Sequence, residues 1–151
     1  MNNIYDMPGH LIRRAQQISS AIFAEECAAF DLTSIQYAAL WAIRFYSDLD
    51  ATRLSRVVAF DRATIGGVLA RIEAKGWVVR TPSATDKRVK LLRLTPAGEE
   101  LLDRVEPAVA RVQERLLEPL APADRTAFMR MMGQLADVYN DITSAPYQAI
   151  D

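Results

Sequence analysis

The segment that most constrains the fold is residues 61–98, DRATIGGVLARIEAKGWVVRTPSATDKRVKLLRLTPAG. Its first part, residues 62–75, repeats apolar side chains at i, i+3, i+4 and i+7, which is the spacing of one buried helix face. These side chains are Ile65, Val68, Leu69 and Ile72. Asp61 can cap the start of this helix, and Gly76 can end it in a left-handed conformation. We therefore expect one amphipathic helix with this face turned into the core.

Short elements surround that helix in a recognisable order. Residues 52–58 form a candidate short helix, and residues 59–61 are a connection of helix-turn-helix length. After the long helix, residues 77–81 and 88–94 are rich in β-branched, aromatic and apolar side chains, and a polar turn at 82–87 separates them. The order predicts a winged helix-turn-helix in a mainly α chain with a small β-hairpin.

The outward face of the predicted helix is almost bare. Its side chains are Ala63, Gly67, Ala70 and Ala74. Gly66 and Gly67 together cost about 2 kcal/mol of helix propensity relative to alanine, so something should approach this face closely. A DNA major groove about 12 Å wide admits a helix, and Arg62, Thr64 and Arg71 on the flanks could then reach bases and phosphates. Packing of the two glycines against a neighbouring protein helix is the alternative.

Positive charge is confined to the same third of the chain. Residues 51–96 hold ten Lys and Arg side chains against three Asp and Glu, a net charge of +7, and because the whole chain carries −1 the remainder carries −8. The ten are Arg53, Arg56, Arg62, Arg71, Lys75, Arg80, Lys87, Arg88, Lys90 and Arg93. This distribution is typical of a protein that binds the phosphate backbone of DNA. A solvated basic surface without a partner is the competing interpretation.

Three stretches resemble the multiple antibiotic resistance regulator (MarR) family of bacterial transcription factors. They are DRATIGGVLARIEAKGWVVR, the Asp86-Lys87-Arg88 run, and LLRLTPAG. The resemblance extends over nearly the whole chain, because the flanking helices also fit in number and length. It implies a homodimer that binds a pseudo-palindromic operator in double-stranded DNA and usually represses. It also implies release from DNA, in many members, by a small aromatic or phenolic acid.

The resemblance assigns DNA-binding roles residue by residue. The major-groove set is Arg62, Ala63, Thr64, Gly67 and Arg71, and the wing set is Lys87 and Arg88 with Asp86 as support. Asp86 would orient Arg88 by an ion pair. We add Arg53 and Arg56 of the preceding helix to the DNA surface. Gly66-Gly67 replaces residues that are commonly polar in relatives. We therefore expect less base recognition by hydrogen bonds, and more by contact of Ala63 with a thymine methyl group and by DNA shape.

The rest of the chain is predicted to form helices that support the DNA-binding part. We expect a single MarR-like domain over 1–151, with the DNA-binding part at 33–96 and a helical dimerisation part at 8–30 and 96–142. The sequence T-x-x-Q at 33–36 is a capping box, and Thr95-Pro96 marks another helix start. The terminal helices carry more apolar surface than one small core needs, and the surplus suits a two-fold dimer. Residues 143–151 lack periodicity and should fray or dock on the partner.

An effector pocket is predicted where the terminal helices meet the DNA-binding part. The candidates are His10, Arg13, Arg14 and Gln17 on the first helix, with Tyr37, Trp41 and Phe45 on the second. Arginine binds a carboxylate in a bidentate manner, and aromatic rings pack on one another, so a small aromatic carboxylate fits this set. Alternatively, the arginines are solvated or paired with acids and the aromatic residues are core.

Other classes of protein are disfavoured. One cysteine, Cys27, and one histidine, His10, exclude an intrachain disulfide and Cys-cluster or His-pair metal sites, so we expect no metal and no cofactor. Cys27 is expected to be a buried structural thiol. No phosphate loop, nucleophile elbow or carboxylate pair indicates an enzyme, and no secretory or membrane-spanning segment is evident, which favours the cytoplasm. A ligand-independent DNA-binding regulator, or a helical module whose wing binds an acidic protein, are the remaining alternatives.

Overall fold

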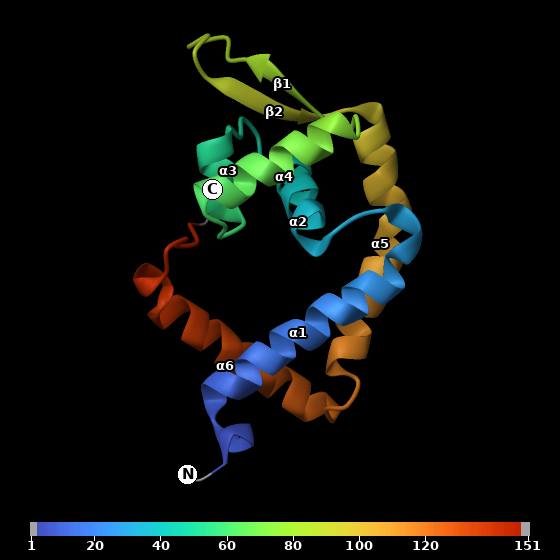
Figure 1. Cartoon of the computed structure of the whole chain (residues 1–151), viewed down its shortest axis with the longest axis vertical. Helices are drawn as coiled ribbons and strands as arrows, with labels where there is room; N and C mark the ends of the chain where they lie inside the picture. Colours follow the sequence, from blue (N-terminus) through green and yellow to red (C-terminus); the bar gives the residue numbers. More distant parts are fainter. Residues whose placement is uncertain (1–2, 149–151) are drawn as a thin grey trace.

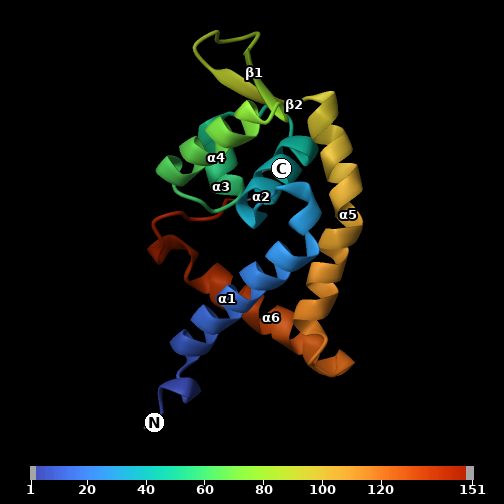
Figure 2. The same cartoon turned by 45° about the vertical axis from the view of Figure 1, so that its right-hand side comes forward.

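The computed structural model describes residues 3–148, and within them helices dominate, with one two-stranded antiparallel sheet (Figure 1). The elements are η1 (Ile4–Asp6), α1 (Pro8–Glu26), η2 (Ala28–Phe30), α2 (Ser34–Phe45), α3 (Ala51–Val57), α4 (Arg62–Ala74), β1 (Val78–Pro82), β2 (Lys90–Leu94), α5 (Pro96–Leu117), α6 (Pro122–Val138) and η3 (Asn140–Ile142). Helices α2, α3 and α4 and the hairpin lie together at one end, and α5 runs from that end to the region of α1 and α6 (Figures 1 and 2). This is the predicted mainly α fold with a β-hairpin.

Side-chain caps start the helices where the sequence predicts them. Thr33 and Gln36 form both hydrogen bonds of the capping box at α2. The Asp61 carboxylate accepts the backbone N–H of Thr64 at 2.8 Å, and the Thr95 hydroxyl accepts that of Gly98 at 3.1 Å. Each cap satisfies a backbone donor that the first helical turn leaves unpaired.

Three predicted boundaries need correction. The first helix ends at Glu26 rather than at about residue 30, since a 3-10 turn follows and Asp31 adopts a left-handed conformation with φ 48°. The short helix begins at Ala51 because Asp50 caps it. The second strand begins at Lys90 and not at residue 88, because residues 83–89 close the wing turn. There Ser83 N–H donates to the Val89 carbonyl at 2.9 Å.

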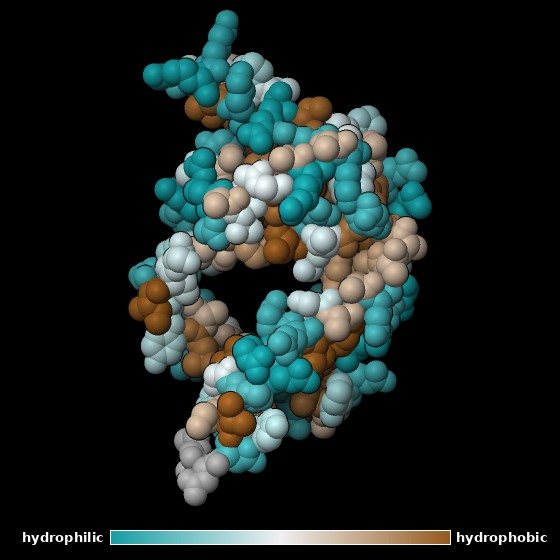
Figure 3. Space-filling model, viewed as in Figure 1, coloured by the Kyte–Doolittle hydropathy of each residue, from teal (hydrophilic) through white to brown (hydrophobic). Residues whose placement is uncertain are grey.

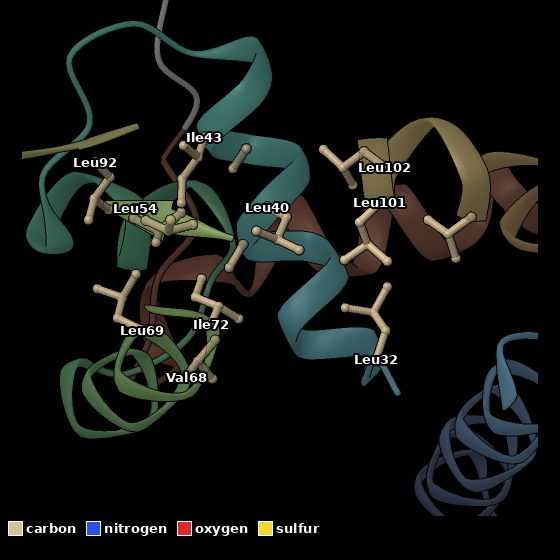
Figure 4. Packing of buried hydrophobic residues seen from close by; sticks show 14 of the residues in the cluster. Leu32, Leu40, Ile43, Leu54, Val68, Leu69, Ile72, Leu92, Leu101 and Leu102 are labelled. Carbon is tan, nitrogen blue, oxygen red and sulfur yellow. The ribbon is translucent and has the colours of Figure 1, made fainter. Parts of the chain in front are cut away.

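The buried face of α4 packs as predicted. Ile65, Leu69 and Ile72 are fully buried, and Val68 is nearly so. They meet Leu40 of α2, Leu54 of α3 and Leu92 of β2, and the leucines at the start of α5 lie on the far side of α2 (Figure 4). One continuous core therefore joins the DNA-binding elements to α5.

The terminal helices expose the apolar surplus that the sequence predicts. Helix α6, which the structure describes in full, buries none of its residues, and α1 buries only Phe23. Figure 3 shows apolar surface in the lower part of the molecule, where these helices lie. The exposed large apolar side chains of α1 and α6 are Leu11, Ile12, Ile18, Met129, Met131, Met132, Leu135 and Val138. Such a surface is what a subunit interface would cover.

The C-terminal segment departs from the prediction that it frays or docks on a partner. The Asn140 amide bonds the Tyr147 backbone twice, accepting from its N–H at 2.7 Å and donating to its carbonyl at 2.8 Å. Gln148 N–H then donates to the Arg56 carbonyl at 3.0 Å. Residues 143–148 thus return to α3 of the same chain, held by the Asn140 side chain and the Arg56 carbonyl. Residues 149–151 lie outside the described residues.

A tight contact joins the hairpin to α5. Gly98, in the first turn of α5, is buried, and a β-carbon there would overlap the backbone carbonyl of Trp77. That carbonyl already accepts the Thr95 N–H at 3.0 Å, so it is not free to move. Glycine is therefore required by close approach and not by backbone conformation.

We expect Gly98→Ala to lower the free energy of unfolding by about 1–3 kcal/mol, as overpacking does, despite the better helix propensity of alanine. Gly66→Ala is the matched control, because a β-carbon at Gly66 meets no described atom within 4 Å. It should raise stability by up to about 1 kcal/mol. Urea denaturation followed by circular dichroism measures both, and equal stabilisation by the two variants would contradict the contact.

Candidate nucleic-acid interface

The outward face of α4 is open. Ala63, Gly66, Gly67 and Ala70 are exposed. A β-carbon added at either glycine would meet nothing within 4 Å among the residues that the structure describes. Packing of these glycines against another helix of the described part of the chain is therefore excluded, and the face is open to an external partner.

The start of α4 is organised by its own polar side chains. The Thr64 hydroxyl donates to the second Asp61 carboxylate oxygen at 2.8 Å, and these bonds from Thr64 lower the pKa of Asp61. Arg62 donates to the Thr52 hydroxyl of α3. Thr64 and Arg62 are thus held in position before any ligand arrives, with the Thr64 hydroxyl oxygen still able to accept a hydrogen bond.

The other predicted cations differ in their surroundings. Arg53 donates to the Asp48 carbonyl at 3.0 Å and is partly buried, so it supports the start of α3 as well as facing solvent. Arg56 is exposed at the end of α3. Arg71 is exposed and borders a cleft of about 520 Å³ between the end of α1 and α4.

The wing tip has the predicted ion pair. The Asp86 carboxylate accepts two hydrogen bonds from the Arg88 guanidinium, at 3.0 and 3.1 Å, and a third from the Arg88 backbone N–H. Arg88 holds the pKa of Asp86 below its ordinary value, so the pair persists through neutral pH and is lost only as pH falls through that lowered pKa. The Arg88 side chain remains 91% exposed. Asp86 therefore orients Arg88 without covering it, and Lys87 beside it is exposed.

Part of the positive charge counted in the sequence is neutralised in the fold. Lys75 pairs with Asp31 at 3.1 Å, Arg93 pairs with Asp48 at 3.0 Å, and Arg80 pairs with Glu73. Asp31 and Asp48 lie outside residues 51–96, which is why a count over the segment does not reveal them. The other exposed cations on α3, α4 and the hairpin are Arg56, Arg62, Arg71, Lys87, Arg88 and Lys90, of which Arg88 is paired with Asp86 but stays exposed. Lys90 is not among the predicted DNA contacts, and the alternation of basic and apolar residues in Arg88, Val89, Lys90 and Leu91 is a signal that could have identified it.

A pocket of about 290 Å³ lies between α2 and α5, beside the predicted effector aromatics. It is lined by Tyr37, Trp41, Arg44, Phe45, Leu102 and Glu106. Burial raises the pKa of the Tyr37 phenol. The lining arginine is Arg44 rather than a residue of the first helix, and its guanidinium is paired with Asp103 at 2.6 Å and Glu99 at 3.1 Å.

The predicted effector residues of α1 do not reach this pocket within one chain. His10 and Arg13 contact each other at 3.2 Å, and Arg14 donates to Gln17 at 2.8 Å. The polar partners of these two arginines are an imidazole and an amide, so their charges are not neutralised there. The structure places Tyr37 and Trp41 together and leaves the α1 set apart from them.

Cys27 is 2% exposed and caps the end of α1. Burial raises the pKa of its thiol, which disfavours the reactive thiolate. The expectation of a buried structural thiol agrees with this environment. Among the described residues, no helix is both long and apolar enough to span a membrane.

Comparisons with known proteins agree with this geometry. A model of the MarR family matches residues 30–89. The HTH-type transcriptional repressor NicR of Pseudomonas putida is 32% identical over 139 residues, which are 90% of this chain and 88% of NicR.

Two solved structures share the whole architecture. The structure of Bordetella bronchiseptica BpsR, whose DNA binding is regulated by 6-hydroxynicotinic acid, is 28% identical with a TM-score of 0.85, covering 91% of this chain and 98% of that one. The transcriptional repressor CouR, bound to a 23-mer DNA duplex, is 28% identical with a TM-score of 0.83, covering 90% and 96%. With the open face of α4 and the Asp86–Arg88 wing on one module, the chain belongs to the MarR family of winged helix-turn-helix transcriptional regulators.

Proposed function

We propose that this chain is a homodimeric repressor that binds a pseudo-palindromic operator. It would act in the cytoplasm, and by binding DNA rather than by catalysing a reaction. The observation that carries the proposal is the bare face of α4 beside the exposed, oriented Arg88. Ala63 and Gly67 let the helix axis approach the base edges of the major groove, with Thr64 and Arg71 at its margins. Arg88 would enter the adjacent minor groove.

A two-fold dimer would place two copies of this DNA-binding module on one operator. Two recognition helices must enter successive major grooves about 34 Å apart, and one chain offers one such helix. The exposed apolar faces of α1 and α6 supply the surface for self-association, and their burial would remove a large apolar patch from water. Repression by relatives such as NicR supports the same role here.

We further propose that a small aromatic carboxylate releases the dimer from DNA. Its ring would pack on Tyr37 and Trp41, whose pocket is already lined by aromatic groups. Arg44 is poorly suited to the carboxylate because Asp103 and Glu99 neutralise it. Arg13 and Arg14 are better suited, as their charges are not paired with acids, and they would have to come from the partner's α1. The regulation of BpsR by 6-hydroxynicotinic acid supports this class of effector.

The test of operator binding begins with selection of sites from a random duplex library by the full chain. We expect a selected site with two half-sites about one helical turn apart, and an affinity that falls steeply between roughly 50 and 200 mM salt. Fluorescence anisotropy with selected and scrambled duplexes measures both. Equal affinity for the two duplexes at every salt concentration would overturn sequence-specific binding and favour the protein-interaction alternative.

Gly67→Leu separates DNA approach from protein packing. Because a β-carbon at Gly67 meets no described atom within 4 Å, the variant should fold with an equal or slightly higher melting temperature. It should nevertheless lose operator binding, since the leucine side chain would hold α4 away from the base edges. A lowered melting temperature with retained affinity would mean that this face of α4 packs on protein in the dimer.

The effector proposal predicts that 6-hydroxynicotinic acid or a hydroxybenzoic acid dissociates the operator complex. The double variant Arg13→Ala/Arg14→Ala should bind the operator normally and require at least about tenfold more acid for release, the cost of a lost charged contact of about 1.5 kcal/mol or more. Arg44→Lys, which preserves the charge beside Asp103, is the control and should respond normally. Release that depends on Arg44 alone would refute the α1 assignment, and no release by any acid would favour a constitutive regulator.

A further inference from the structure

Asp48, in the loop between α2 and α3, contacts both the helix-turn-helix and the wing. Its carboxylate lies 3.0 Å from Arg93 Nη2 on β2, and its backbone carbonyl accepts a hydrogen bond from Arg53 Nη1 on α3 at 3.0 Å. Its backbone is left-handed, with φ 56°, a conformation that Asp and Asn tolerate better than most residues. One residue therefore joins two elements that the DNA surface needs in a fixed relation.

The next residue, Leu49, joins this loop to strand β2 by a backbone hydrogen bond. Leu49 is fully buried, and its carbonyl accepts the Leu92 N–H at 2.7 Å. Strand β2 is thus held on one side by β1 and on the other by the loop. Because Asp48 precedes Leu49 and Arg93 follows Leu92, the Asp48–Arg93 pair is the next cross-strand contact along an antiparallel arrangement.

The energy of this pair is too small to explain it as a device for stability. The two side chains are 64% and 47% exposed, and exposed ion pairs contribute about 0.2–1 kcal/mol. The pair lies near the base of the hairpin, however, and Arg88 lies in the wing turn five residues earlier, so at most about 16 Å of extended chain separates them. A swing of about 10° at the base would move the tip by up to about 3 Å, enough to break a hydrogen bond there.

We propose that Asp48 is a positioning residue for DNA binding, which sets the angle of the wing relative to α4 so that Arg88 reaches its groove while α4 occupies the adjacent one. The inference rests on the proposed operator binding. It gives Asp48 a role on this basic surface beside those of Asp61, which caps α4, and Asp86, which orients Arg88.

Because Asp48 is acidic, the proposal predicts a change in DNA affinity opposite to the one that simple electrostatics predicts. On electrostatic grounds alone, removal of an exposed carboxylate from a DNA-binding surface should strengthen binding, because one repulsion with phosphate disappears and Arg93 is released. A positioning role requires the opposite result. It also requires that the loss depend on Arg88, since Asp48 acts on DNA only through the wing.

The experiment is a double-mutant cycle with Asp48→Lys and Arg88→Ala, measured by anisotropy on the selected operator. Asp48→Lys should weaken binding about fivefold, the factor that corresponds to an ion pair of about 1 kcal/mol. In the Arg88→Ala background the same change should cause no loss. Glu100→Lys, an equal reversal of charge at an exposed site on α5, is the control and should leave affinity unchanged or raise it.

Thermal melts accompany each variant, and where Asp48→Lys does not fold, Asp48→Asn replaces it, because asparagine tolerates the left-handed conformation. Asp48→Asn should weaken binding about twofold in the wild-type background and should cause no loss in the Arg88→Ala background. Tighter binding by Asp48→Lys, or equal losses with and without Arg88, would overturn the positioning role. If the wild-type chain itself fails to bind any selected operator, the proposed function fails instead.

Discussion

The burial of one face of α4 is the constraint on which the rest of the molecule depends. Ile65, Leu69 and Ile72 are completely removed from solvent between α2, α3 and the hairpin. Burial of each such side chain is worth about 1.5–3 kcal/mol, so rotation of the helix about its axis would be costly. Since a helix turns about 100° per residue, this orientation necessarily directs Ala63 and Gly67 outward. The recognition face is thus positioned by the hydrophobic core behind it.

A second dependence runs through the joint between the hairpin and α5. The Thr95 hydroxyl donates to the Gly76 carbonyl at 2.6 Å, its N–H donates to Trp77, and Gly98 lies against the same backbone. Gly76 has φ 76°, which lets the chain leave α4 and enter β1 within a short turn. A movement of α5 would therefore displace the base of the wing. The proposed effector pocket lies along α5, so ligand binding there and wing geometry share a rigid element.

Acidic residues organise the basic surface. Asp61 caps α4, Asp86 orients Arg88, and Asp48 joins α3 to β2. Each leaves a neighbouring cation exposed or fixes the backbone that presents it. A DNA-binding surface built only of cations would have no such internal support, and long basic side chains would each lose more conformational entropy on binding.

Local signals in the sequence were enough for the elements and for the face of α4. Periodicity identified Ile65, Val68, Leu69 and Ile72 as core, and the cap residues Thr33, Asp61 and Thr95 marked helix starts, because both depend on neighbours within about one helical turn. The wing pair Asp86–Arg88 was predicted from the family resemblance, and its members are only two positions apart in the sequence. Only the tertiary structure placed Asp48 beside Arg93, Asp31 beside Lys75 and Asp103 beside Arg44, because these contacts join residues more than forty positions apart. It also decided that the predicted effector residues of α1 lie outside the α2–α5 pocket in one chain and that the tail returns to α3. Helix directions and chain reversals follow from packing of the whole core and not from any local pattern.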